Sequence, residues 1–180
     1  MTKATRTLLV GLAMTGLMAV GRPAMAAELE PPVVSHVRST NLAILELILQ
    51  ATNQSATFRG LVDTINASSD FVYVEEGVCG HGVRSCLMSV TVTHGHRLLW
   101  VYVDTHRSDR DLMGSIGHEL RHTVEVLENP AIRTRQAMNA FYSQVGYHGT
   151  STAFETMAAI AAGDAVRAEL RKHRASVNAN

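Results

Sequence analysis

The sequence predicts an α+β domain in which a small antiparallel sheet packs on helices. Three observations support this fold class: helical spacing of apolar residues before residue 67, β-branched or alternating segments between residues 71 and 104, and helical spacing again after residue 108. No segment repeats, and no Gly-, Pro- or Ser-rich linker divides the sequence. We therefore expect a single domain after the leader.

The first 26 residues have the features of a secretory signal peptide. A positively charged start precedes an apolar run, and Ala24-Met25-Ala26 matches the A-x-A cleavage signal. The apolar run is shorter than the roughly 20 residues of a membrane span, although an uncleaved anchor is the alternative interpretation. We expect residues 27–180 to be exported, periplasmic or secreted, without stable membrane insertion after cleavage.

The charge of the exported part argues against nucleic acid as a partner. Removing the leader takes away Lys3, Arg6 and Arg22 but no acidic residue, so the net charge falls from zero to −3 with neutral histidines. The remaining basic residues form no stripe along the sequence, and such a stripe is the usual electrostatic mark of a nucleic-acid-binding surface.

Two helices and a strand are predicted in the first part of the domain. Residues Asn41–Gln50 are rich in leucine and isoleucine with few breaks, which favours a helix. Ser55 is suited to cap a second helix that ends near Asn66. The β-branched and aromatic segment Phe71–Glu75 is typical of a strand.

A β-hairpin is predicted next. Cys86–Thr93 alternates, with Leu87 and Met88 starting opposite faces, and Arg97–Asp104 is the most apolar strand of the sequence. The glycine-containing turn His94-Gly95-His96 joins the two segments, as in a hairpin.

Helices dominate the remainder of the sequence. Pro130 is well placed to start a helix that runs to about Val145, because proline suits the first helical position. Thr150 or Ser151 is then expected to cap a last, alanine-rich helix that ends near Arg174.

The segment Gly117–His122 carries the clearest chemical signal. It reads His-Glu-x-x-His within a predicted helix that follows the capping residue Ser108. His118 and His122 lie four positions apart on one helix face, where two imidazoles can bind one zinc ion. Glu119 is rotated about a quarter-turn away and is placed to accept a proton from water that the metal activates. This pattern predicts a zinc-dependent hydrolase with Glu119 as general base.

A hydrolytic zinc site needs three protein ligands and an open position, so a third ligand must come from elsewhere. We expect Glu155, which lies 33 residues after His122 and in the first turn of the predicted last helix. Glu125 shares the face of the histidines, but helical side chains lean toward the N-terminus, which favours a supporting role. His148, in the loop between the last two helices, is the third alternative.

Other polar residues are candidates for transition-state hydrogen bonds, namely Tyr142, Tyr147 and His148. A peptide or protein substrate is expected to add as a strand to an edge of the sheet above the motif helix. The candidate edge is the strand Arg97–Asp104 or its hairpin partner.

Two cysteines, Cys79 and Cys86, lie in the exported part of the chain. In an oxidising compartment they are expected to form a disulfide that closes a small loop around Gly80-His81-Gly82. A metal site built from both cysteines and His81 is the alternative, and it requires thiolates that escape oxidation.

The helix with His118, Glu119 and His122 resembles that of the zincin metallopeptidases, and a downstream glutamate ligand resembles the gluzincins. The wider sequence is similar to small exported bacterial proteins of uncharacterised function that share two segments, here Gly117–Val126 and Glu155–Ala159. The resemblance implies a single zincin-like domain over residues 27–180, with zinc as cofactor and metallopeptidase activity.

The sequence departs from the gluzincin pattern at one position. Gluzincins usually carry an acidic residue four positions after the glutamate ligand, where it steadies a ligand histidine, but here that position is Ala159. Another group, such as Glu125, would have to orient the ring. The alternative to a peptidase is a non-catalytic zinc-binding or interaction module of the cell envelope that retains a zincin-like fold.

Overall fold

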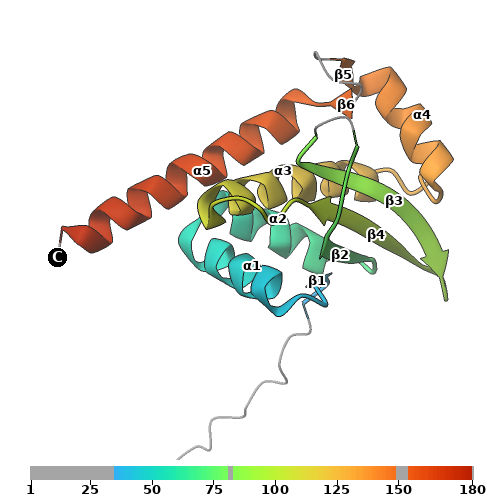
Figure 1. Cartoon of the computed structure of the whole chain (residues 1–180). Coiled ribbons are helices and arrows are strands. Elements are labelled where there is room, and N and C mark those ends of the chain that lie inside the picture. Colours follow the sequence, from blue (N-terminus) through green and yellow to red (C-terminus); the bar gives the residue numbers. More distant parts are fainter. Residues whose placement is uncertain (1–34, 81–82, 149–153, 180) are drawn as a thin grey trace, which may run out of the picture. The chain divides into compact units, whose positions relative to one another are not determined.

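The computed structural model describes residues 35–80, 83–148 and 154–179. Within these ranges the chain forms five helices and a four-stranded mixed sheet, so the predicted α+β class is confirmed (Figure 1). The predicted signal peptide, residues 1–26, lies outside the described residues. None of the described helices is both long and apolar enough to cross a membrane.

The sheet is mixed, with strand order β1-β2-β4-β3, and the prediction of a purely antiparallel sheet was wrong. β1 (Val37–Arg38) and β4 (His96–Val103) both run parallel to β2 (Phe71–Glu76), and only β3 (Ser85–Thr93) runs antiparallel to β4. β3 follows β2 in the sequence but lies at the edge beyond β4, so the hairpin returns β4 beside β2. The most apolar strand thereby occupies the interior of the sheet.

The β3–β4 hairpin has the turn that the sequence predicts. His94 and Gly95 both have positive φ, 47° and 88°, as both central residues of a type I′ turn do. Glycine adopts this conformation without steric cost, which explains its place in the turn. The turn sets the register of the hairpin, which pairs Thr93 with His96.

A β-bulge interrupts β3 between Leu87 and Ser89, with Met88 as the extra residue. Leu87 packs against the core and Val90 belongs to it, although residues three apart in a regular strand face opposite sides. The predicted alternation along β3 therefore fails at the bulge. Beyond Met88, the residues that were predicted to face away from Leu87 lie on the same side of the sheet as Leu87.

The first two helices cover the sheet together with the motif helix. α1 (Leu42–Gln54) is capped by the side chain of Asn41, and α2 (Ala56–Asn66) is capped by Ser55 as predicted. Their apolar faces meet one face of the sheet and form the core. The largest fully buried side chains are those of Phe58, Ile44, Ile65, Leu99, Ile116 and Leu120.

The motif helix α3 (Asp109–Leu127) lies at the centre of the domain. Ser108 caps it, and Asp109 and Asp111 complement the positive end of its dipole, as the sequence predicts. α3 contacts β3 and β4 with one face and α5 with another, so most of its second half is buried. Side chains on α3 are therefore held by packing from two directions.

Helix α4 (Arg135–Val145) begins later than predicted. Its N-cap is Thr134, whose hydroxyl accepts a hydrogen bond from the backbone N–H of Ala137, and the predicted start at Pro130 was wrong. A turn closed by a hydrogen bond from the N–H of Ile132 occupies the intervening segment. The helix therefore begins where the side chain of Thr134 can cap it, and not at Pro130, although proline is suited to the first turn of a helix.

Helix α5 (Met157–Asn178) also starts later than predicted. Its N-cap is Thr156 and not Thr150 or Ser151, which lie outside the described residues. A two-stranded ribbon of β5 (Tyr147–His148) and β6 (Phe154–Glu155) precedes the helix. Glu155 is thus the last residue of a strand.

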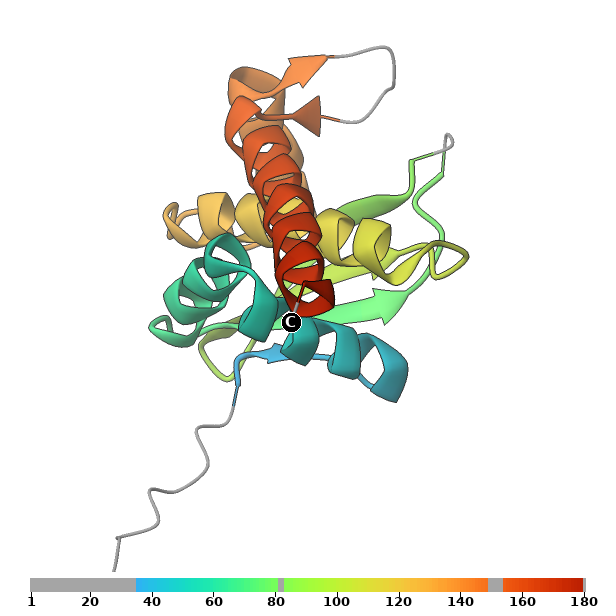
Figure 2. The ribbon, with the colours of Figure 1, turned by 90° about the vertical axis from the view of Figure 1, so that its left-hand side faces the viewer.

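Helix α5 crosses over α3 (Figure 2), and the crossing is close because glycines line it. A Cβ atom on Gly117 of α3 would lie 2.9 Å from Cγ2 of Val166, and one on Gly163 of α5 would lie 3.1 Å from Cβ of His118. Larger residues at these positions would push the helices apart. The absence of side chains therefore allows the start of α5 to approach His118.

A buried arginine fixes the end of α3. The guanidinium of Arg97 pairs with Asp70, with Nε 2.8 Å from Oδ2, and donates to the carbonyls of Val126, Leu127 and Asn129. The carbonyls of Val126 and Leu127 lie at the C-terminal end of the helix, where partial negative charge accumulates and cations are stabilising. Arg97 thereby joins the start of β4 to the end of the motif helix.

We expect Asp70→Ala to lower the free energy of unfolding by about 3–5 kcal/mol, because it leaves the buried Arg97 without its carboxylate. Urea denaturation measures the loss. Asp164→Ala is the matched control, since its pair with Arg167 is partly exposed and should contribute less than about 1 kcal/mol. Equal effects of the two substitutions would show that Arg97 does not depend on Asp70.

Candidate metal centre

The two motif histidines lie side by side on α3. Their ring centroids are 4.9 Å apart, and their side chains are largely buried, with 16% of His118 and 6% of His122 exposed. A spacing of four residues places both rings on one helix face, one turn apart. The predicted face is therefore present, and both Nε2 atoms are directed toward the same acidic side chain.

That acidic side chain is Glu155. Its Oε2 lies 2.9 Å from Nε2 of His118 and 3.8 Å from Nε2 of His122, and the ligand atoms of the three residues all lie within 4.8 Å of one another. The placement of Glu155 in the first turn of a helix was wrong, because the residue ends β6. Its convergence on the histidine pair agrees with the sequence analysis, and the group could hold a metal ion.

The chemistry of this group fits a cation. Oε2 of Glu155 is buried, and its 2.9 Å contact with Nε2 of His118 does not count as a hydrogen bond, so no described residue donates to it. A buried carboxylate oxygen without a donor is costly, and a cation between the three groups would satisfy it. Two imidazole nitrogens and a carboxylate are a ligand set that zinc takes in catalytic sites.

The electrostatics of the site also favour positive charge. Burial works to raise the pKa of Glu155, but the imidazoles of His118 and His122 outweigh it and lower that pKa to about 2. Burial works to lower the pKa of His122, but the carboxylates of Glu125 and Glu155 outweigh it and raise that pKa to about 9. Metal binding therefore competes with a proton on His122 at neutral pH.

Glu125 orients the second histidine. Its Oε2 lies 2.9 Å from Nδ1 of His122, and its Oε1 accepts a 2.7 Å hydrogen bond from the hydroxyl of Thr156. Since a carboxylate only accepts, Nδ1 keeps its proton when the ring is neutral, and Nε2 is then free to bind a metal ion beside Glu155. This geometry matches the predicted orienting role and supplies the carboxylate that is missing at Ala159.

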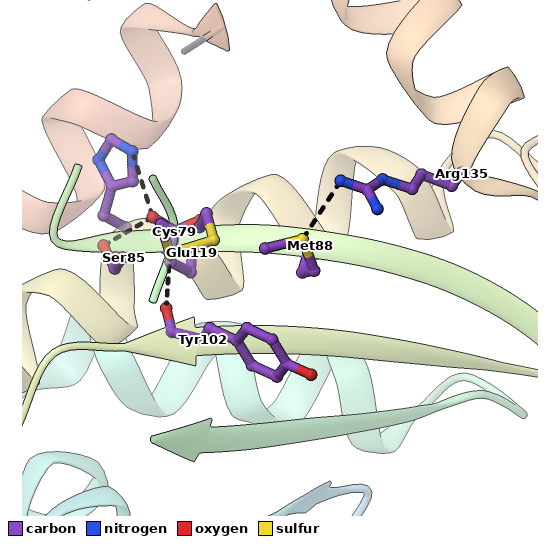
Figure 3. The surroundings of a disulfide bond; sticks show 8 residues. Cys79, Ser85, Met88, Tyr102, Glu119 and Arg135 are labelled. Carbon is purple, nitrogen blue, oxygen red and sulfur yellow. Dashed lines mark hydrogen bonds and ion pairs between the residues drawn. A yellow bond between two sulfur atoms is a disulfide. The ribbon is translucent and has the colours of Figure 1, made fainter. Parts of the chain in front are cut away.

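The carboxylate of Glu119 lies beside the ligand group. It is buried, with Oε1 4.0 Å from Nε2 of His118, and that oxygen accepts a 2.7 Å hydrogen bond from the hydroxyl of Ser85 (Figure 3). Ser85 was not predicted as a site residue; it comes from β3 and lies 34 residues before Glu119. Its one sequence signal is its position next to Cys86.

The predicted disulfide between Cys79 and Cys86 is present. It lies at the start of β3, close to Ser85 and Glu119, and the Sγ atom of Cys79 contacts the carbonyl of Tyr102 (Figure 3). Both sulfurs are bonded to each other, so the alternative of a thiolate metal site is not formed. His81, its third member, lies outside the described residues.

A cavity of about 220 Å³ opens over the candidate metal centre. The disulfide and the start of β3 form one wall, and α4 together with β6 forms the opposite wall. His118, His122, Glu119 and Glu155 all reach it, so a molecule in the cavity would contact the ligand group directly. The remaining lining combines the polar side chains of Arg135, Asn139 and Tyr142 with apolar ones, namely Val83, Leu87, Met88, Met138 and Phe154.

The three candidate transition-state donors have different outcomes. Tyr142 lines the cavity, but its hydroxyl donates a 2.8 Å hydrogen bond to the carbonyl of His122, and its ring packs against the His122 ring. Tyr142 therefore supports the position of the ligand. Tyr147 and His148 form β5, but their side chains lie outside the described part of the structure.

Comparison with known proteins adds no identification. A scan against protein-family models finds no match, and searches among curated proteins and solved structures find no significant match. Assignment of a function therefore depends on the geometry and chemistry of this site.

We expect Glu155→Ala to lose zinc on buffer exchange, because it removes the only carboxylate among the three converging groups. Glu125→Ala should retain zinc with an affinity about 10–100-fold weaker, as found for partners that orient a ligand. Zinc titration and metal analysis after gel filtration measure both effects, with the exposed Glu128→Ala as control. Loss of zinc from Glu125→Ala but not from Glu155→Ala would reverse the assignment.

Proposed function

We propose that this protein is an exported, zinc-dependent metallopeptidase of zincin type. The observation that carries the proposal is the convergence of Glu155 on His118 and His122, with the carboxylate of Glu119 beside them in an open cavity. The motif helix, a second helix that follows the third ligand, and a sheet edge alongside support a zincin-like arrangement. The disulfide supports export, since disulfides persist in oxidising compartments.

The residues of the chain divide the chemistry among them. Zinc held by His118, His122 and Glu155 would supply a Lewis acid and would lower the pKa of water bound to it. The carboxylate of Glu119 accepts a proton from the attacking water and returns it to the leaving amine. Ser85 fixes this carboxylate by donating to Oε1, which reduces the reorganisation that proton transfer requires.

The topology of the sheet favours an extended peptide as substrate. Of the two strands that the sequence offers as an edge, β4 lies between β2 and β3, whereas β3 is the edge strand and lines the cavity through residues 85–88. A peptide that pairs with β3 would use the unpaired backbone groups of an edge for affinity. Such a peptide would pass directly over Glu119.

We expect zinc-loaded wild-type protein to hydrolyse peptides from a mixed pool, and Glu119→Gln to lower kcat at least about a hundredfold. Glutamine has a similar shape but cannot accept the proton, so zinc content should not change. Mass spectrometry of the products and metal analysis check both expectations, with Glu128→Gln as the matched exposed control. One equivalent of zinc without hydrolysis in the wild type would instead indicate a non-catalytic metal-binding module.

Ser85→Ala should lower kcat about tenfold and leave KM and zinc content nearly unchanged, because it removes a hydrogen bond to a charged carboxylate. Steady-state kinetics on the best peptide measures the change. Ser85→Thr retains the hydroxyl and should recover most of the rate, while Ser89→Ala, beyond the bulge on the same strand, is the control. An unchanged kcat in Ser85→Ala would remove Ser85 from the proposed machinery.

A further inference from the structure

The cavity over the candidate metal centre has one guanidinium in its wall. Arg135, the first residue of α4, is the only lysine or arginine among the described residues that line the cavity. Its side chain reaches from α4 toward Met88 on β3, some way along the strand from Ser85 and Glu119 (Figure 3). The cavity therefore has the acidic catalytic groups near one end and a guanidinium near the other.

The guanidinium of Arg135 has unused hydrogen-bonding capacity. Its one hydrogen bond within the described structure is a 3.4 Å contact from Nη2 to the sulfur of Met88, which is a weak acceptor. No described carboxylate lies within ion-pair distance of Arg135, whereas Arg97 and Arg167 each pair with one carboxylate and Arg121 pairs with two. α4 also has no acidic residue in its first turn, so the positive end of its dipole adds to the charge.

The distance between Glu119 and Arg135 along β3 determines which residue of a bound peptide would lie next to the guanidinium. Ser85 and Met88 are three residues apart on β3, which corresponds to somewhat less than about 10 Å, because the bulge at Met88 shortens the regular rise of the strand. A peptide that lies extended along β3 would therefore present to Arg135 a group two or three residues from the cleaved bond. The rest of the lining is mostly apolar, with Leu87, Met138 and Phe154, and it also includes the amide of Asn139.

We infer that Arg135 selects peptides that carry a carboxylate two or three residues from the cleaved bond, with an apolar residue between. A guanidinium binds a carboxylate with two parallel hydrogen bonds, which gives specificity as well as affinity. The carboxylate is either that of an acidic side chain or that of the peptide terminus, since both present the same group. The inference rests on the proposed peptide hydrolysis and narrows its substrate class.

The test compares three synthetic peptides that share one apolar sequence. One ends in a free carboxylate, one is amidated and carries glutamate, and one is amidated and carries glutamine at the same position. Their affinities are measured by fluorescence anisotropy on zinc-loaded Glu119→Gln protein, alone and combined with Arg135→Gln or Arg133→Gln. Arg133 is exposed and does not line the cavity, so its substitution changes the net charge equally and serves as the matched control.

We expect at least one carboxylate peptide to bind about tenfold more tightly than the glutamine peptide, with the preference lost in Arg135→Gln and kept in Arg133→Gln. Preference for the free terminus would assign the site to chain ends, and preference for glutamate would assign it to acidic side chains. Equal affinities, or a preference that survives Arg135→Gln, would overturn the inference.

Hydrolysis by the wild type is measured on the same peptides. A binding preference without hydrolysis would refute the proposed function alone, and hydrolysis without a binding preference would refute the inference alone.

Discussion

The close crossing of α3 and α5 is the constraint on which the candidate metal centre depends. Gly117 and Gly163 remove the side chains that would separate the two helices. The N-terminus of α5 is then joined to α3 twice, by Thr156 on Glu125 and by Glu155 against His118. Glu155 at the end of β6 therefore converges on two histidines of the rigid helix α3, and regular elements hold geometry better than loops do.

The other end of α3 is fixed just as firmly. Arg97 connects the last carbonyls of the helix to Asp70 and to the start of β4, so the helix cannot slide along the sheet without breaking a buried ion pair. The hydrogen bond from Ser85 to Glu119 ties the first strand of the hairpin to the middle of the same helix. The register of the motif relative to the sheet is therefore set at two points.

Local signals in the sequence predicted much of the fold and of the site. The capping residues Ser55 and Ser108, the His94–Gly95 turn and the spacing of His118 and His122 depend on neighbouring residues, and the structure contains each of them. The parallel pairing of β2 with β4 depends on where a connection crosses the sheet, which no periodicity reports. The hydrogen bond of Ser85 likewise joins segments that only the tertiary fold brings together.

The open edge of β3 has a consequence beyond substrate binding. This strand contains neither a charged residue nor a proline, the two features that most often prevent edges from pairing with another chain. Its protection comes instead from the bulge at Met88 and from the disulfide at Cys86, which interrupt the regular ladder at the end nearest the cavity. An edge that is accessible to peptides is equally a template for a second copy of the same strand, so self-association is the liability that accompanies this architecture.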